Sequence, residues 1–198
     1  MVKLINADCM DIMKTYTDNY FDLAIVDPPY RNTNQPDQWL RANNGDMKKW
    51  EPAPKKEYFD ELFRVSKNQI IWGGNYFTNH LEPNNNWIIW HKLNDGVHFS
   101  MCEMAWNSIR KNIKLFKLLP PKDKIHPTQK PIQLYKWLLD KYSEKGQKIL
   151  DTHLGSGSSA IASHYFGVGE FVGIEIDKEY FDKATKRIED QTKQLTIF

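Results

Sequence analysis

The sequence of 198 residues has little cysteine, no long apolar run and almost no net charge. Only Cys9 and Cys102 are present, and neither belongs to a pair with metal-ligand or redox spacing. The six histidines show no arrangement that places two ligands on one helical face, so we expect no metal. No apolar stretch approaches the ~20 residues of a membrane span, and the first ten residues lack the pattern of a secretory signal. We therefore expect a cytoplasmic protein without a membrane anchor.

The net charge of +2 is unevenly distributed along the chain. Eleven basic and three acidic residues lie between Arg110 and Lys148, which gives this stretch a charge of +8. Such a block suits a polyanion such as nucleic acid, although a solvated lysine-rich helix and loop would have the same composition. The 40% apolar and 13% aromatic content excludes a mainly disordered chain. The length predicts a single domain over residues 1–198.

Strands and helices are predicted to alternate along the chain. Strands are expected where short apolar runs end in turn signals, and helices where apolar residues recur every three or four positions. The expected strands are Val2–Asn6, Phe21–Asp27, Gln69–Trp72, Trp87–Trp90, Met104–Trp106, Lys148–Asp151 and Glu170–Ile176, and the expected helices are Asp8–Tyr16, Glu57–Ser66, Pro131–Tyr142, Gly157–Phe166 and Lys178–Gln191. Residues 31–56 show no periodicity and predict an inserted loop. The alternation predicts a mostly parallel sheet covered by helices on both faces.

A glycine turn follows the strand predicted at Lys148–Asp151. In the run DTHLGSG, residues 151–157, two glycines allow the backbone to approach a ligand closely. A further strand brings Glu175 to its end, twenty residues after Gly155, where a carboxylate can accept both hydroxyl hydrogens of a ribose. The pattern indicates a nucleoside cofactor. A purely structural turn is the alternative, and Ala160 at the third glycine position of the dinucleotide fingerprint disfavours NAD without excluding it.

A rigid pair of acceptors is predicted at Asp27-Pro28-Pro29-Tyr30, where the strand Phe21–Asp27 ends. Consecutive prolines fix φ and cannot donate hydrogen bonds, so the Asp27 carboxylate and the Pro28 carbonyl project as acceptors beside Tyr30. Two acceptors and an aromatic face match a flat base that bears an exocyclic amine. An ordinary strand exit closed by a proline turn is the structural alternative.

These motifs resemble those of the DNA amino-methyltransferases that use S-adenosylmethionine, in particular the small phage-type adenine methyltransferases. The matching segments span almost the whole chain and are residues 27–30, 71–77, 99–108, 126–131, 151–162 and 173–177. The tetrapeptide precedes the glycine turn, which resembles the circularly permuted order of class β. The resemblance implies an α/β, Rossmann-like methyltransferase fold with a mixed seven-stranded sheet, its last strand antiparallel, and short recognition insertions near residues 31–56 and 92–125.

The resemblance also implies the residues of the site. The catalytic residues would be Asp27, Pro28, Pro29 and Tyr30, and the cofactor-binding residues Asp8, Cys9, Asp27, Thr128, Lys130, Asp151, Thr152, His153, Gly155, Ser156, Gly157, Glu175 and Ile176. Asp8 and Cys9 would contact the adenine edge of S-adenosylmethionine, and Glu175 would hold its ribose. Thr128 and Lys130 would lie near the methionine carboxylate. The product would be S-adenosylhomocysteine, and no metal is implied.

The acceptor pair implies methyl transfer to the N6 of an adenine flipped out of double-stranded DNA. Asp27 at the first catalytic position favours adenine N6 over cytosine N4, which stays the alternative. The residues expected to contact DNA are Arg31, Trp39, Arg41, Lys48, Lys49, Arg110, Lys111, Lys114 and Lys117. Class β relatives are often dimers, so we expect a homodimer by analogy.

Two alternatives come from other classes of protein. A catalytically silent nucleic-acid-binding module would keep the basic stretch but has no need for the tetrapeptide at Asp27. A nicotinamide oxidoreductase would keep the glycine turn and Glu175, but the sequence offers no obvious set of hydride-handling residues.

Overall fold

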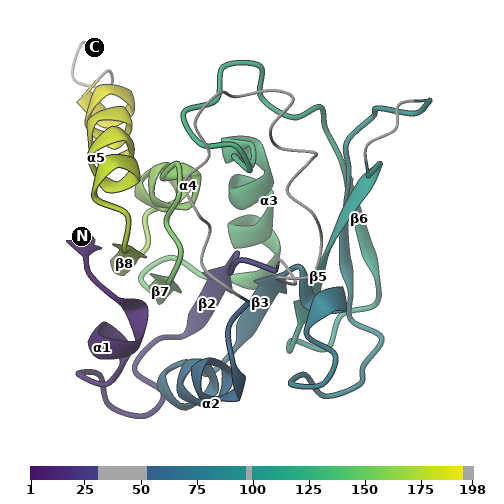
Figure 1. Cartoon of the computed structure of the whole chain (residues 1–198), viewed down its shortest axis with the longest axis horizontal. Coiled ribbons are helices and arrows are strands. Elements are labelled where there is room, and N and C mark those ends of the chain that lie inside the picture. The colour runs from purple at the N-terminus through teal and green to yellow at the C-terminus, as the bar shows by residue number, and fades with distance from the viewer. Residues whose placement is uncertain (31–52, 97–99, 194–198) are drawn as a thin grey trace.

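A mixed β-sheet forms the centre of the computed structural model, which describes residues 1–30, 53–96 and 100–193 (Figure 1). Its strands are β1 (Val2–Asn6), β2 (Leu23–Val26), β3 (Gln69–Trp72), β4 (Ile88–His91), β5 (Cys102–Asn107), β6 (Lys114–Lys117), β7 (Lys148–Asp151) and β8 (Glu170–Glu175). The helices are α1 (Cys9–Met13), α2 (Lys56–Val65), α3 (Ile132–Tyr142), α4 (Ser158–Phe166) and α5 (Lys178–Lys193). A short 3₁₀ turn, Gly74–Tyr76, follows β3.

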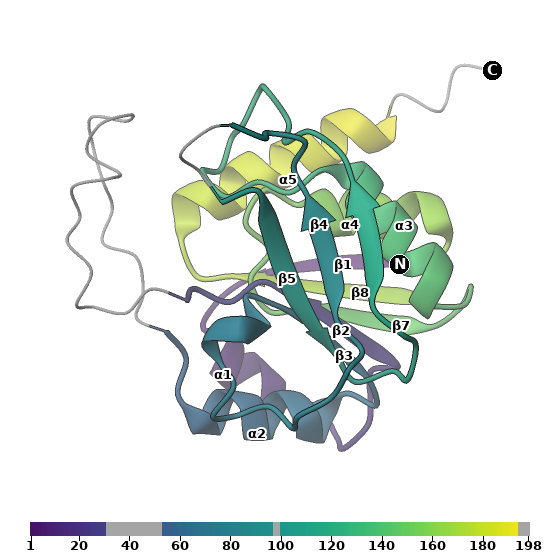
Figure 2. The ribbon, with the colours of Figure 1, turned by 90° about the vertical axis from the view of Figure 1, so that its right-hand side faces the viewer.

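The strand order is β1-β8-β7-β2-β3-β5-β4-β6. The first five strands in this order are parallel, β5 is antiparallel to both β3 and β4, and β6 is parallel to β4. Figure 2 shows β4, β5 and β6 together on one side of the sheet. The expectation of seven strands is wrong, because β6 adds an eighth within the described ranges. The antiparallel strand is β5, inside the sheet, whereas β8, the last strand along the chain, is parallel.

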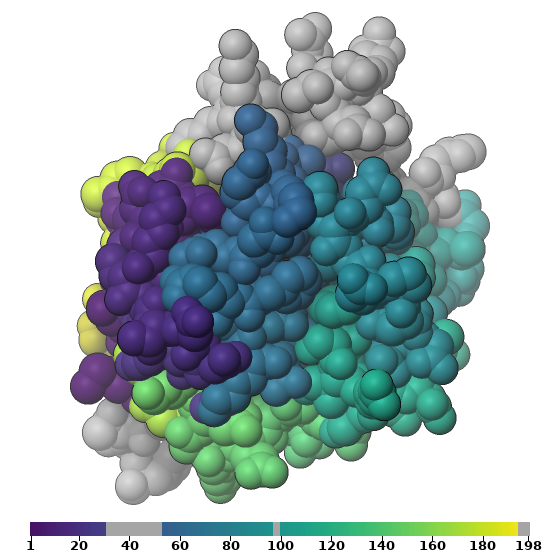
Figure 3. All heavy atoms as spheres, turned by 90° about the horizontal axis from the view of Figure 1, so that it is seen from below, coloured from purple at the N-terminus to yellow at the C-terminus, as the bar shows by residue number. Residues whose placement is uncertain are grey.

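Helices cover both faces of the sheet, as the alternation predicted. α3, α4 and α5 lie on one face and α1 and α2 on the other (Figure 1). Figure 3 shows the outer side of the second layer, where residues of the first 30 positions (purple) lie beside residues of α2 (blue). The longest helix, α5, has 16 residues. No helix in the described ranges is therefore long and apolar enough to cross a membrane.

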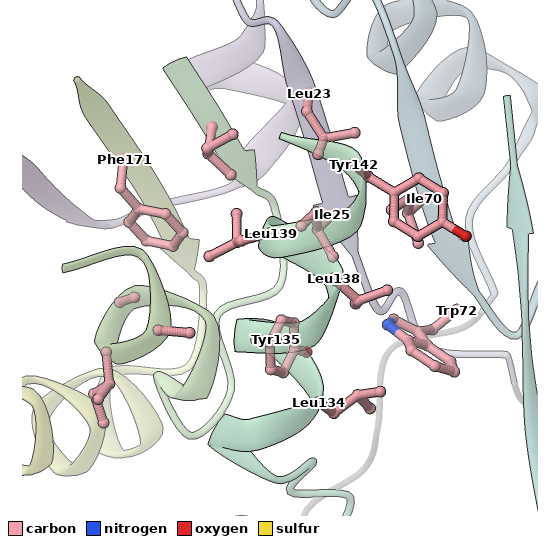
Figure 4. Close-up of a cluster of buried hydrophobic side chains, with 14 of the residues drawn as sticks. Leu23, Ile25, Ile70, Trp72, Leu134, Tyr135, Leu138, Leu139, Tyr142 and Phe171 are labelled. Atoms are coloured by element: carbon pink, nitrogen blue, oxygen red, sulfur yellow. The ribbon is translucent and has the colours of Figure 1, made fainter. Parts of the chain in front are cut away.

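The central strand β2 supplies both halves of the core, because successive side chains of a strand point to opposite faces. Leu23 and Ile25 belong to the cluster beneath α3, where Leu138 and Leu139 lie close to them (Figure 4). Ala24 and Val26 belong to the cluster beneath α2. All four strand residues are buried, so β2 is the continuous apolar run expected of a strand covered on both faces.

The parallel strands β2, β7 and β8 end at the same edge of the sheet. Asp27 follows β2, Asp151 is the last residue of β7, and Glu175 is the last residue of β8. In open α/β sheets, ligands bind outside the carboxyl ends of such strands. The topology therefore gathers the acidic residues of the two sequence motifs at one place.

Candidate active site

A cavity of about 490 Å³ lies at the carboxyl ends of β2, β7 and β8, within the range of small-molecule sites. Eleven predicted site residues line it, namely Asp27, Pro28, Pro29, Tyr30, Thr128, Lys130, His153, Gly155, Ser156, Glu175 and Ile176. Residues that the sequence did not assign to a role also line it: His126, Pro127, Gln129, Tyr135, Leu154, Ser158, Asp177 and Tyr180. Three of these belong to the HPTQKP segment, which was recognisable in the sequence.

Glu175 is fixed at one end of the cavity by two backbone amides. The Gly155 N–H donates to Glu175 Oε2 at 2.9 Å, and the Asp177 N–H donates to Oε1 at 3.0 Å. Burial raises the pKa of Glu175, and these hydrogen bonds, together with one from the Ile176 backbone, oppose the rise. A carboxylate has about four acceptor positions, so Glu175 keeps acceptor capacity for a ligand. Ile176, with 46% of its surface exposed, offers an apolar surface beside them.

Asp151 lies behind the cavity wall and holds the glycine turn. It is 2% exposed, and it accepts hydrogen bonds from Ser159 Oγ at 2.5 Å and from the His153 N–H at 3.0 Å. Burial raises the pKa of Asp151 to about 7. Thr152 is also buried and shares a hydrogen bond of 2.6 Å with the Tyr58 hydroxyl of α2. Both residues therefore support the site and do not line the cavity.

Gly157 also lies behind the cavity and allows α5 to pack closely. Its φ is +75°, and a Cβ at this position would lie 2.7 Å from Ile188 Cδ1 of α5. A larger residue would therefore require the Ile188 side chain to move, and it would be strained at this left-handed φ. The glycine serves close packing between elements, a role that the fold reveals and the local motif does not.

Asp8 and Cys9 are not among the residues that line the cavity. Asp8 is exposed and caps α1, because its Oδ1 accepts from the Met10 N–H at 2.7 Å. Cys9 is half-buried at the start of this helix. Asp8 uses one oxygen for this cap, and its charge acts on the pKa of the cavity residue His153; the expected contact of Asp8 and Cys9 with an adenine edge stays a prediction.

Asp27 lies at the other end of the cavity and is paired on one side only. Lys130 Nζ lies 2.5 Å from Asp27 Oδ2 and 2.9 Å from Glu103 Oε2. Asp27 Oδ1 is buried and has no hydrogen-bond partner among the described residues. Burial raises the pKa of Asp27, while Lys130 acts to lower it. The Lys130 ammonium therefore faces two carboxylates of this chain, and its expected contact with a methionine carboxylate stays a prediction.

Tyr30 lies flat between the cavity and the 3₁₀ turn. Its ring stacks on Tyr76 with centroids 4.8 Å apart and planes 4° apart. Gly73 has a φ of +69°, and a Cβ there would collide with the Tyr30 ring. Burial raises the pKa of Tyr30, so its hydroxyl stays neutral. The segment 71–77 therefore sets the plane of the aromatic ring beside Asp27.

The two histidines of the cavity are uncharged near neutral pH. Burial lowers the pKa of His126 and of His153 to about 4 in each case. His126 packs edge-on against Tyr180, with centroids 4.4 Å apart, and its Nδ1 lies 3.2 Å from Thr128 Oγ1. The cavity wall at this point is polar but carries no positive charge.

The residues expected to contact DNA fall into two groups. Arg31, Trp39, Arg41, Lys48 and Lys49 lie outside the described residues. Arg110, Lys111, Lys114 and Lys117 are exposed, the last two on β6. Lys111 is engaged at the end of α3, where its Nζ donates to the Lys141 carbonyl and lies 5.0 Å from the Tyr142 ring centroid.

Comparison with known proteins finds similarity to DNA methyltransferases. Residues 100–186 match the family N6_N4_Mtase, described as DNA methylase. The type II methyltransferase M2.DpnII of Streptococcus pneumoniae is 29% identical over 76% of this chain and 52% of its own length. M.HpaI of Haemophilus parainfluenzae is 25% identical over 96% of this chain and 74% of its own length. The chain thus spans about half the length of M2.DpnII.

Solved structures share the fold. The M1.HpyAVI–SAM complex has a TM-score of 0.68 at 22% identity and covers 95% of this chain and 99% of its own. The cytosine-N4-specific PvuII DNA methyltransferase has a TM-score of 0.64 at 11% identity and covers 98% of this chain and 92% of its own. The chain therefore has the Rossmann-like fold of these methyltransferases. In sequence it is similar to the DNA amino-methyltransferases, through the family match over part of the chain and the type II relatives.

Proposed function

We propose that the chain is a DNA methyltransferase that transfers a methyl group from S-adenosylmethionine to the exocyclic N6 of an adenine flipped out of double-stranded DNA. The observation that carries this proposal is the free Oδ1 of Asp27, which is buried without a partner among the described residues while Oδ2 is held by Lys130. A buried acceptor without a donor costs free energy. An exocyclic amine that enters the cavity supplies such a donor.

The chain's own residues prepare the amine for transfer. Asp27 Oδ1 and the Pro28 carbonyl would accept its two hydrogens, which draws the nitrogen lone pair out of conjugation with the base. The Tyr30 ring would stack on the base and hold its plane. No covalent intermediate is required, so catalysis rests on orientation and electrostatic preorganisation.

The other end of the cavity fits the cofactor. Glu175 keeps acceptor capacity that a ribose hydroxyl can use, and Ile176 offers an apolar face for the adenine. His153, Gly155 and Ser156 would line the path toward the methionine end. When bound, S-adenosylmethionine supplies an electrophilic methyl group on a sulfonium. The solved complex of M1.HpyAVI with SAM, on the same fold, supports this choice of cofactor.

The choice of base rests on Asp27. An aspartate at this position favours adenine N6, as the sequence resemblance implies. Cytosine N4 is the second candidate, because it presents the same amine chemistry and the PvuII enzyme on this fold is cytosine-N4-specific. Double-stranded DNA as the partner is supported by the exposed Arg110, Lys114 and Lys117, and a homodimer stays a prediction by analogy.

The test is methyl transfer to unmethylated DNA, followed by digestion to nucleosides and mass spectrometry. Asp27→Ala should bind S-adenosylhomocysteine like the wild type but transfer no methyl group, whereas Asp60→Ala, which removes an exposed carboxylate of α2, should be fully active. N6-methyladenine made by the wild type but not by Asp27→Ala supports the proposal, and N4-methylcytosine would keep the mechanism and change the base. Transfer by Asp27→Ala would refute the role of the carboxylate. A wild type that binds cofactor and methylates no DNA would refute the proposed substrate.

A further inference from the structure

Asp27 is the end of a row of four alternating charges. Lys92 Nζ lies 2.7 Å from Glu103 Oε1, Glu103 Oε2 lies 2.9 Å from Lys130 Nζ, and Lys130 Nζ lies 2.5 Å from Asp27 Oδ2. Lys130 is the most deeply buried member, with 1% of its side chain exposed. The four residues come from four parts of the chain: the end of β4, β5, the segment before α3 and the end of β2.

The Lys130 ammonium contacts both of its neighbours in this row. Its Nζ donates a hydrogen bond to Asp27 Oδ2 and forms an ion pair with Glu103 Oε2. The group also lies 5.2 Å from the ring centroid of Trp72, a cation–π distance. Its backbone is anchored as well, because Ser158 Oγ of α4 donates to the Lys130 carbonyl at 2.8 Å. This chain therefore holds Lys130 both at its ammonium and at its backbone, beside the cavity that it lines.

We propose that Lys130 and Glu103 are positioning residues for the acceptor carboxylate: Glu103 holds the Lys130 ammonium, which fixes Asp27 Oδ2 and leaves Oδ1 directed at the substrate amine. The inference rests on the proposed function and deepens it. The terminal torsion of an aspartate is broad, so a carboxylate without a fixed oxygen would sample many orientations. Lys130 removes this freedom and opposes the rise in the pKa of the buried carboxylate, which favours Oδ1 as an acceptor.

The two positioning residues act on Asp27 with opposite sign. Lys130 lowers the pKa of Asp27, whereas the negative charge of Glu103 raises it. The charged and titratable groups around Asp27 are Lys92, Glu103, Lys130, Tyr30, Tyr58, Tyr135 and Asp151. Lys130→Met should therefore move the acid limb of the kcat profile to higher pH, and Glu103→Gln should move it to lower pH. A merely loosened site would lower kcat without these opposite shifts.

The experiment compares Lys130→Met and Glu103→Gln with Lys67→Met. The control removes a lysine that pairs with Asp22 at 2.7 Å at the opposite end of β2 and is half exposed. We expect Lys130→Met to lower kcat about 10²-fold, the order of loss that misplaced reacting groups cause, and to bind S-adenosylhomocysteine within about threefold of the wild type. A shift of one pKa unit changes the ratio of kcat at low and high pH by up to about tenfold. Lys67→Met should match the wild type in every readout.

Each result of these measurements either supports or overturns the positioning role of Lys130 and Glu103. Loss of S-adenosylhomocysteine binding by Lys130→Met with an unchanged kcat would make Lys130 a cofactor ligand and overturn the inference. An active wild type with kcat and pH profile unchanged in both variants would overturn it too, while leaving the proposed function intact. A wild type that methylates no DNA refutes the proposed function itself. If Lys130→Met does not fold, Glu103→Gln decides by its shift, because glutamine keeps the size of glutamate and an oxygen that can still accept from Lys130.

Discussion

Replacing Glu175 by glutamine tests the cofactor end of the cavity with the smallest change of shape. In the native chain, Oε2 accepts from the Gly155 N–H and Oε1 from the Asp177 N–H. Glutamine replaces one of these oxygens by an NH₂ group, which would face a backbone N–H. One hydrogen bond to a charged acceptor is lost in the free protein, and a ribose hydroxyl loses its acceptor at the same oxygen.

The two losses have separate magnitudes. A hydrogen bond to a charged group contributes about 1.5–3 kcal/mol, so the lost ribose contact should raise the Kd of S-adenosylhomocysteine about 10- to 150-fold. The unsatisfied backbone N–H should lower the free energy of unfolding by about 1–3 kcal/mol. The first effect belongs to binding and the second to stability, so two measurements distinguish them.

The assay is isothermal titration calorimetry with S-adenosylhomocysteine, combined with urea unfolding of the free protein. Glu189→Gln is the matched control. Glu189 lies exposed on α5, and within the described part of the chain its ion pair is with Lys193. This variant should leave the Kd of S-adenosylhomocysteine and the free energy of unfolding unchanged. A Glu175→Gln variant that unfolds more easily but binds S-adenosylhomocysteine as tightly as the wild type would refute the ribose contact. Glu175 would then serve only the turn.

Two further predictions concern the aromatic wall and the dependence of stability on pH. Gly73→Ala should lower methyl transfer while S-adenosylhomocysteine still binds, because a Cβ at Gly73 collides with the Tyr30 ring and a left-handed alanine adds about 1 kcal/mol of strain. Gly146→Ala, with a φ of +84° and no atom near its Cβ position, carries the strain without the collision; equal kinetics in both variants would contradict the role of the ring. The free energy of unfolding should decrease as the pH is lowered from 6.5 to 4. In this range His126 and His153, with pKa values of about 4 in the fold, stay neutral there, while the same histidines in the unfolded chain take up protons. Each histidine contributes a slope of up to about 1.4 kcal/mol per pH unit, so His153→Gln should flatten the decline in urea unfolding at pH 4.5 to 7.5. Asp151, with a pKa of about 7 in the fold, contributes less to the free energy of unfolding as the pH rises from about 4 to 7, which is opposite to the histidines. Asp151→Asn should therefore steepen the decline in stability toward low pH. A wild-type free energy of unfolding that is independent of pH, and unchanged in both variants, would show that these groups titrate alike in the folded and unfolded chain.

The sequence predicts the bounds of several strands and misses β6. Val2–Asn6, Gln69–Trp72 and Lys148–Asp151 form strands with the expected bounds, because short apolar runs closed by turn signals favour a strand. β6 was not predicted. Its sequence is KLFK with Leu115 half exposed, so it lacks both a buried run and a clean alternation. The fold creates this strand by pairing it with β4.

The site could be predicted where its geometry is local. The Gly155 turn and Glu175 follow from strand ends that the sequence reveals, and both line the cavity. The partners of Lys130 could not be predicted, because Asp27 lies 103 positions away along the chain and no local pattern pairs them.

The pairing of β1 has a consequence for the order in which the chain can fold. β1 lies at the edge of the sheet and pairs with β8, from Val2 with Phe171 to Asn6 with Glu175, so its partners are 169 positions away. β2 meets β3 after only 45 positions, as in the pair Ala24 and Gln69. Contacts between distant positions form slowly, and a chain emerging from the ribosome acquires its strands in sequence. During synthesis, β2 and β3 beside Asp27 can pair early, whereas β1 must wait unpaired until β8 has emerged and the Glu175 edge can close.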